Sequence, residues 1–162
     1  MTQLAVKPTE LSADDLEFAV ATHEQALPAW ASRNTLAGFL HIVMKPYHDD
    51  LPDVHAGLEY AFADGSDGRD GFAILAGFDG RLVGAVVFLK TNMGGYVPEN
   101  LLLFVAVDPE LRNKGIGRRL IEMAIARCEG SVKLHVEPDN PAKRLYERIG
   151  FNNKYLEMRY SK

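Results

Sequence analysis

Blocks of hydrophobic and polar positions predict an α/β chain whose order of elements is clearest after residue 70. Two β-rich runs, Phe72 to Phe78 and Arg81 to Leu89, flank Asp79-Gly80, a dipeptide typical of tight hairpins. The wholly apolar run from Leu101 to Val107 predicts a buried central strand. These three segments therefore predict the middle of a sheet that begins with an antiparallel pair.

The rest of the pattern predicts two helices that alternate with strands. Apolar residues recur at helical spacing over Gly115 to Cys128, and a strand is expected over Val132 to Val136. Because a helix joins them, the strands before and after that helix should be parallel. A final helix begins with Asn140 as its cap and ends at Gly150, and a last strand is expected over about Lys154 to Tyr160.

The first seventy residues have a less regular pattern. A short strand is expected over Leu4 to Lys7, and a helix from its cap Ser12 to about Leu27. Further helices are expected over about Arg33 to Lys45 and over Leu51 to Ala63.

Composition narrows the class of protein. Hydrophobic residues make up 47% of the chain, enough for a single domain spanning residues 1–162 with a real core. Eighteen basic and twenty-two acidic residues give a formal charge of -4, which does not support a nucleic-acid partner. No apolar run is long enough to cross a membrane, and the first residues lack the features of a signal peptide, so a cytoplasmic protein is expected.

A metal site is not expected from the cysteine and histidine content. The single cysteine, Cys128, excludes an internal disulfide and a cysteine-rich zinc site. Histidine and aspartate residues cluster between positions 48 and 55, but their spacing matches no recognised ligand set. We interpret this cluster as a solvated acidic loop.

The segment from Arg112 to Gly117 carries the most informative chemistry. It reads Arg-Asn-Lys-Gly-Ile-Gly and joins the apolar strand to the following helix. Its glycines let backbone N–H groups approach a ligand closely, and the unpaired amides and dipole of a first helical turn favour an anion. Basic side chains surround this turn: Arg112, Lys114, Arg118 and Arg119. The expected ligand therefore carries phosphate.

Other phosphate-binding folds fit this segment less well. In a dinucleotide-binding fold, Glu137 would stand where a ribose-binding acid belongs, twenty residues after Gly117. However, Leu120 occupies the place of the third glycine, and the twenty-five residues after Glu137 are too few for the remaining strands. The Walker sequence Gly-x-x-x-x-Gly-Lys-Ser/Thr is absent from the chain.

Two ordered blocks carry a resemblance to a known family. Arg112, Gly115 and Gly117 match the pattern Arg/Gln-x-x-Gly-x-Gly/Ala, and the block Asn140 to Phe151 follows at the expected distance. Over about Phe72 to Tyr160 the chain resembles the GCN5-related N-acetyltransferase (GNAT) family. The resemblance implies a mixed, mainly antiparallel sheet flanked by helices, with a core of strand, phosphate loop, helix and strand. It also implies acetyl-CoA as the co-substrate.

The resemblance implies which residues bind the cofactor. The phosphate loop would hold the pyrophosphate, and the pantetheine arm would enter between two strands that splay apart. The family's asparagine position falls on Asp139, one place before Asn140, so the contact to the arm falls on one of these two residues. The expected cofactor-binding residues are Val105, Ala106, Val107, Arg112, Asn113, Lys114, Gly115, Ile116, Gly117, Arg118 and Asn140.

The resemblance also implies the catalytic groups. A backbone N–H near Val105 to Val107, freed by a local irregularity, would polarise the thioester carbonyl and contribute about 3 to 4 kcal/mol. Tyr146 would protonate the departing thiolate, although its place on the apolar helix face also fits an ordinary core aromatic. Glu99, which precedes the central strand, is a candidate base. His135, Glu137 and water-mediated deprotonation are the open alternatives.

We therefore predict an acetyl-CoA-dependent N-acetyltransferase that moves an acetyl group directly to a primary amine of a small molecule or peptide. The alternative is a non-catalytic acyl-CoA-binding sensor or interaction module. The family places the acceptor near its first two helices, where the acidic residues between 48 and 55 would suit a cationic amine. Dimers are common in the family, so a homodimer is compatible with this prediction.

Overall fold

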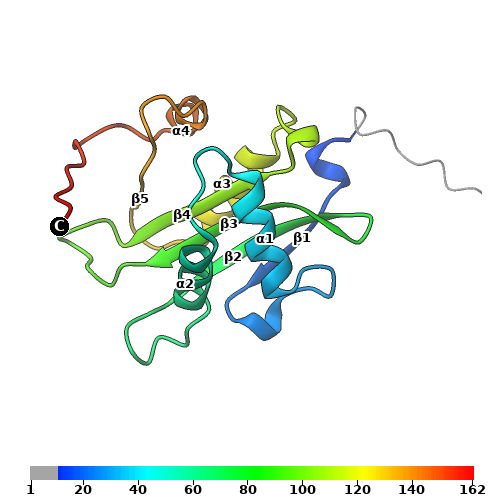
Figure 1. Cartoon of the computed structure of the whole chain (residues 1–162), viewed down its shortest axis with the longest axis horizontal. Helices are drawn as coiled ribbons and strands as arrows, with labels where there is room; N and C mark the ends of the chain where they lie inside the picture. The colour runs from blue at the N-terminus through cyan, green and yellow to red at the C-terminus, as the bar shows by residue number, and fades with distance from the viewer. Residues whose placement is uncertain (1–10) are drawn as a thin grey trace, which may run out of the picture.

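The computed structural model describes residues 11–162, which form a five-stranded sheet with helices on both faces (Figure 1). Neighbouring strands are antiparallel, except for β4 and β5, which are parallel. In space the strands follow their chain order: β1 (Glu17–Ala21), β2 (Gly71–Phe78), β3 (Arg81–Lys90), β4 (Asn100–Val107) and β5 (Val132–Leu134). The predicted mixed, mainly antiparallel sheet is confirmed.

Four α-helices cover the sheet. α1 (Arg33–Val43) and α2 (Leu51–Ala61) lie in front of it in Figure 1, and α3 (Ile116–Arg127) lies behind. α4 (Ala142–Ile149) follows β5 and lies above it in this view. Three short 3₁₀ turns complete the described elements: Ala13–Asp15, Glu24–Ala26 and Pro109–Leu111.

The sheet separates two apolar cores. Successive strand residues point to opposite faces, so Ile74 packs into one core and Leu75 into the other. The core under α1 and α2 includes Leu36, Leu40, Val54, Leu58, Leu75 and Phe104. The core under α3 includes Ile74, Phe88, Ile116, Leu120, Ile121 and the α4 residue Tyr146.

The hairpin and three of the predicted helices are confirmed. Asp79 and Gly80 have φ of 49° and 69°, the left-handed conformation that a two-residue turn between β2 and β3 requires. α1, α2 and α3 begin within one residue of their expected starts and end within two. Asn140 Oδ1 accepts the N–H of Ala142 at 2.9 Å, the kind of bond expected of a cap, although α4 begins at Ala142 and its N-cap position is Pro141, one residue later than predicted.

The helix predicted from Ser12 to Leu27 is wrong. Ser12 caps only a 3₁₀ turn, and the chain then enters β1, which pairs antiparallel with β2. Phe18 and Val20 pack against the core under α3, whereas Ala21 packs under α1 and α2. This period of two suits a strand, and sheet pairing overrides the helix propensity of the alanines. The strand expected over Leu4 to Lys7 lies outside the described residues.

The end of the chain also differs from the expectation. No strand forms over Lys154 to Tyr160, and β5 stops at Leu134 instead of continuing to Val136. Leu156 and Met158 have the alternation of a strand, but they are 85% and 91% exposed. A strand is stable only where its backbone groups pair, and no described segment pairs with the outer edge of β5.

The strand predicted over Leu101 to Val107 forms as β4, but the prediction that it is central and buried is wrong. β3 is the middle strand of the five, and β4 lies beside the short edge strand β5. Buried and partly exposed residues alternate along β4. The wholly apolar sequence therefore reflects burial on one side and, on the other, the apolar surface described below.

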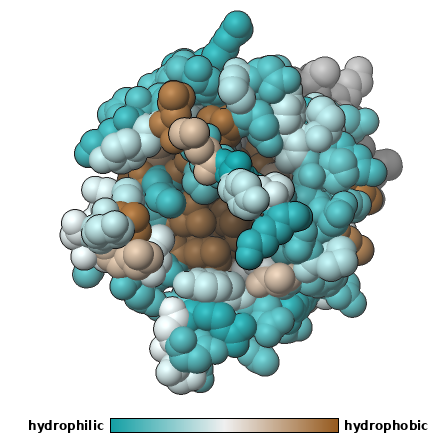
Figure 2. Space-filling view, turned by 60° about the vertical axis from the view of Figure 1, so that its left-hand side comes forward, coloured by the Kyte–Doolittle hydropathy of each residue, from teal (hydrophilic) through white to brown (hydrophobic). Residues whose placement is uncertain are grey.

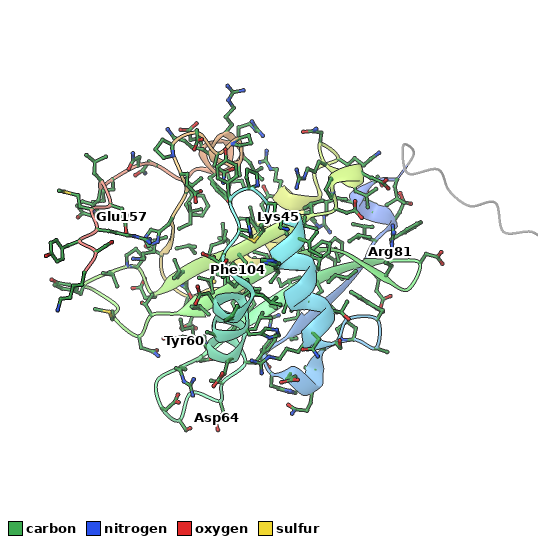
Figure 3. All side chains as sticks on the ribbon, viewed as in Figure 1. Lys45, Tyr60, Asp64, Arg81, Phe104 and Glu157 are labelled. Atoms are coloured by element: carbon green, nitrogen blue, oxygen red, sulfur yellow. The ribbon has the colours of Figure 1, made fainter. Side chains whose placement is uncertain are left out.

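β4 contains a bulge. Phe104 pairs with Val87, but the next residue of β3 pairs with Leu102, so Leu103 has no partner on β3. As a result, Leu103 and Phe104 both pack toward α1 and α2, and Phe104 lies between the sheet and these helices (Figure 3). Gly57 of α2 makes room for them, because a Cβ there would lie 2.7 Å from Leu103 Cδ2 and 2.9 Å from Phe104 Cε2.

We expect Gly57→Ala to destabilise the protein by about 1–3 kcal/mol, because the added methyl group overpacks the bulge. The matched control is Gly38→Ala in α1, where a Cβ meets no atom within 4 Å. That control should stabilise the protein by about 0.5–1 kcal/mol through helix propensity. Urea unfolding of the two variants checks the prediction, and equal stability changes would contradict it.

Candidate active site

The sheet opens between β4 and β5. The two strands pair only over Asn100–Leu102 and Val132–Leu134, and beyond Leu102 no described strand pairs with this edge of β4. Figure 1 shows β5 diverging from β4 and leading up to α4. When the left-hand side of Figure 1 is turned toward the viewer, the molecule shows a hollow with an apolar floor (Figure 2). The partly buried apolar residues of the surrounding elements include Val105, Val107, Leu134, Leu145 and Ile149.

The bulge lies on the strand that borders this hollow. A bulge leaves its extra residue outside the ladder, so it is a local source of an unpaired backbone amide. Sequence reasoning expected such an irregularity near Val105 to Val107, whereas the register places it at Leu103. The apolar sequence of β4 gave no signal for its position, where Leu103 and Phe104 pack close to Gly57 of α2.

The phosphate loop presents open amides at the end of β4. Asp108 caps a 3₁₀ turn, and then Asn113 and Gly115 adopt the left-handed conformation with φ of 62° and 80°. Gly115 is the N-cap of α3 and supplies no capping side chain. The first amides of α3 therefore face outward with the positive end of the helix dipole, an arrangement suited to an anion.

The basic side chains of the loop are arranged differently from the expectation that all four surround the turn. Arg112 directs its guanidinium at two main-chain carbonyls, those of Val43 and Val107. Arg118 pairs with Glu122 at 2.7 Å one helical turn later. Arg119 is exposed and forms no ion pair with the part of the chain that the structure describes.

Gly117 faces the gap between β4 and α4. A Cβ at this position would lie 3.5 Å from Leu145 Cδ2 and 3.6 Å from Val107 Cγ2, which are ordinary contact distances. A side chain at position 117 would therefore project between the strand that borders the hollow and the helix that carries Tyr146.

Tyr146 lies on the inner face of α4 and is 8% exposed. Its ring packs edge-to-face on Phe151, with the ring centroids 6.0 Å apart. Its hydroxyl makes no hydrogen bond with any residue from 11 to 162. Burial, with a smaller contribution from Glu137, raises the pKa of Tyr146 to about 12. The phenol is therefore protonated at neutral pH and has a donor proton to offer.

Glu99 lies at the opposite end of β4 from the phosphate loop. Its carboxylate accepts the N–H of Ser131 at 2.8 Å, and this hydrogen bond lowers the pKa of Glu99. It lines a cavity of about 610 Å³ that includes Lys90, Asn100 and Cys128, but neither Tyr146 nor the phosphate loop. The structure does not bring the two predicted catalytic residues together in that cavity, and the assignment of Glu99 as the base stays a prediction.

We expect Glu99→Gln to leave kcat within about twofold, because the glutamine amide still accepts from Ser131 and the lowered pKa already makes the carboxylate a weak base. Glu99→Ala, which also removes the acceptor, is the comparison for stability. Steady-state rates of the glutamine variant decide the role, and a tenfold fall in kcat would assign the base to Glu99.

The other candidate groups lie near the β5–α4 segment. His135 and Glu137 are exposed, and Asn140 Nδ2 donates to Glu137 Oε2 at 3.4 Å. Tyr47, which sequence reasoning missed, donates its hydroxyl to the carbonyl of Asp139 at 3.2 Å. Desolvation and the neighbouring Asp139 raise the pKa of Tyr47. Its position in a loop 92 residues away in sequence gave no signal for this contact.

The remaining candidates from the sequence are the thiol of Cys128 and the histidine and acidic side chains that resemble metal ligands. Cys128 is half-buried, and this burial raises the pKa of its thiol. Over residues 11–162, no three histidine, cysteine or acidic side chains gather as a metal site. Within the same range, no helix has the length and apolar content needed to cross a bilayer.

Comparison with known proteins decides the family. The model of the acetyltransferase (GNAT) family matches residues 4–151. The chain belongs to this family. Its five-stranded sheet agrees with that assignment, because the chain superposes on solved GNAT-type structures. A possible acetyltransferase from Clostridium difficile 630 gives a TM-score of 0.63 at 20% identity, covering 91% of this chain and 97% of that one.

Two further relatives have named activities. Aminoglycoside N-acetyltransferase AAC(6')-Iy, solved with CoA, gives a TM-score of 0.62 at 18% identity and covers 91% of this GNAT chain and 94% of its own. Mycothiol acetyltransferase of Clavibacter michiganensis is 37% identical over 79 residues, which are 47% of this chain and 24% of that protein. The chain thus spans about a quarter of the length of this curated relative, and 7% of the mouse cysteine-rich protein 2-binding protein, with 40% identity over 57 residues.

Proposed function

We propose that the protein is an acetyl-CoA-dependent N-acetyltransferase that transfers the acetyl group directly to a primary amine. The observation that carries this proposal is the parting of β4 from β5 beside the uncapped first turn of α3. The turn suits the pyrophosphate of CoA, and the apolar hollow suits the pantetheine arm. Asn140, Gly117 and the end of β4 would then line the path of the arm.

The residues around the hollow suit direct transfer. The amine nitrogen attacks the thioester carbon, the carbonyl oxygen gains charge, and an amide at the Leu103 bulge stabilises that charge. The C–N bond forms, the C–S bond breaks, and Tyr146 donates its proton to the departing thiolate. The nitrogen of the tetrahedral intermediate, which is an ammonium after the attack, releases its proton to water. Water, and not Glu99, is the acceptor that we favour, because the Glu99 carboxylate is bonded to Ser131. The Tyr146 phenolate regains a proton from water, and the products are the amide and the free thiol of CoA.

Acidic groups on the acceptor side favour a cationic amine. Asp49 and Asp50 lie in the α1–α2 connection, and Glu137 and Asp139 lie in the β5–α4 segment. All four are exposed, and none forms an ion pair with a described residue. The named acetyltransferases among the relatives include one for aminoglycosides, which are polycationic amines. Small cationic amines are therefore the first acceptors to test.

Calorimetry with CoA, followed by release of free thiol from acetyl-CoA, tests the proposal. The acceptor panel should contain aminoglycosides, polyamines, amino acids and short peptides. We expect CoA to bind and thiol release to depend on one class of amine. Absence of CoA binding would overturn the proposal, whereas binding without release for any acceptor would favour the non-catalytic acyl-CoA sensor.

A further inference from the structure

Arg112 joins the phosphate loop to the end of α1. Its Nε donates to the carbonyl of Val107 at 3.3 Å, and its Nη2 donates to the carbonyl of Val43 at 3.0 Å. Val107 ends β4, and Val43 ends α1. The last carbonyls of a helix lack intrahelical partners and carry the negative end of its dipole, so a guanidinium there is stabilising. The first residue of the phosphate motif therefore bonds to protein backbone on two elements.

The segment that follows Val43 is held at a second point. Residues 44–50, the α1–α2 connection, begin at the upper end of α1, where Figure 3 labels Lys45. In Figure 1 the connection rises toward α4 before it enters α2. Tyr47 in this connection donates to the carbonyl of Asp139, next to Asn140, whose side chain accepts the N–H of Ala142. The connection therefore spans the gap between the end of β4 and the start of α4.

The connection also carries polar side chains. The His48 ring packs edge-to-face on His41 at 5.0 Å, and its buried Nδ1 has no hydrogen-bond partner in the described chain. His41 Nδ1 is 2.9 Å from the carbonyl of Asp49, which orders the same segment. A shift of the connection would move this imidazole and the neighbouring acidic side chains together.

We propose that Arg112 is a positioning residue for the amine acceptor. By fixing the end of α1 against the phosphate loop, it holds residues 44–50 opposite the reacting thioester. The inference rests on the proposed function, because it takes the phosphate loop as the donor site. A donor that orders the loop also orders the connection through Arg112, and such coupling is reciprocal between donor and acceptor.

Arg112→Lys separates this role from a direct action on phosphate. Lysine keeps the positive charge but lacks the planar fork that bonds two carbonyls. We expect the KM for the amine to rise about tenfold, with the Kd for CoA changed less than about twofold. Arg119→Gln, which removes a charge from the same end of α3, is the matched control. It should weaken CoA binding and leave the KM for the amine unchanged.

Tyr47→Phe provides a second variant that leaves the phosphate loop intact. It removes the other tether of residues 44–50 and should also raise the KM for the amine with CoA affinity retained. If both variants keep the wild-type KM for the amine, the proposal is wrong. It is also wrong if Arg112→Lys weakens CoA binding as strongly as Arg119→Gln does.

Amide hydrogen exchange gives a readout that does not need an identified acceptor. CoA should protect residues 44–50 in the wild-type protein and fail to protect them in Arg112→Lys. Protection that is equal in the two proteins, or absent from a wild-type protein that binds CoA, would overturn the positioning role alone. Failure of the wild-type protein to bind CoA would overturn the proposed function, and this inference with it.

Discussion

Gly117→Trp is expected to reduce the affinity for CoA at least about 100-fold. A Cβ at this position lies in ordinary contact with Leu145 and Val107, so the rest of the side chain must extend into the gap between α4 and β4. An indole ring there occupies the proposed path of the pantetheine arm. It also covers the open amides of the first turn of α3.

The matched control for this prediction is Gly117→Ala. Its methyl group fits at 3.5 Å and 3.6 Å from its neighbours, and Gly117 is not among the glycines with positive φ. The alanine variant should therefore bind CoA within about threefold of the wild-type affinity. Calorimetry on both variants, with circular dichroism to verify folding, provides the measurement. Wild-type affinity in the tryptophan variant would place the CoA site elsewhere.

Tyr146→Phe is expected to lower kcat by about 10²-fold, near the lower end of the effect of a general acid, and to leave the Kd for CoA nearly unchanged. The lower end applies because burial raises the pKa of the phenol to about 12, which makes it a weaker acid. The isosteric ring preserves the contact with Phe151. Stopped-flow measurement of acetyl transfer separates the chemical step from product release, and an unchanged rate would remove Tyr146 as the acid.

The same substitution should change the response to alkaline pH. The folded pKa of Tyr146 is about 12, above the value of about 10 in an unfolded chain. The stability contributed by its protonated form is therefore complete below pH 10 and is lost as pH rises toward 12. Over this interval the wild-type protein should lose on the order of 2–3 kcal/mol more than Tyr146→Phe. If the free energies of unfolding of the wild-type protein and Tyr146→Phe fall in parallel with pH, the phenol is not buried in solution.

The sequence predicted correctly the elements that depend on residues close together in the chain. The Asp79-Gly80 turn, the apolar stripe of α3 and the capping bond of Asn140 each depend on residues within one turn of each other. Two segments whose structure depends on distant pairing were predicted incorrectly, although β4 and β5 were expected as strands. Ala19 and Ala21 have helix propensity, but pairing with β2 makes them a strand, and Leu156 has strand character but no partner.

The features of the candidate site also fall into two groups, those with a local sequence signal and those without one. The motif Arg112 to Gly117 and the position of Tyr146 could be predicted, because a spacing of few residues carries each signal. The bulge at Leu103 and the bridge from Tyr47 to Asp139 could not, since each needs a partner far away in sequence. The direction of the Arg112 side chain could not be predicted either, because the helix end to which it donates lies 69 residues earlier in the chain.

The two apolar cores suggest how variants of this protein should be built. Most of the residues proposed to bind the cofactor lie on the α3 and α4 side of the sheet, and the α1–α2 side has a separate set of packing partners. Randomised libraries in α1 and α2 can therefore explore new substrates, provided that they keep Gly57, which packs against the Leu103 bulge of β4. Arg112 joins the two sides, so a library that alters the end of α1 should keep the helix end in place, where the carbonyl of Val43 accepts from Arg112.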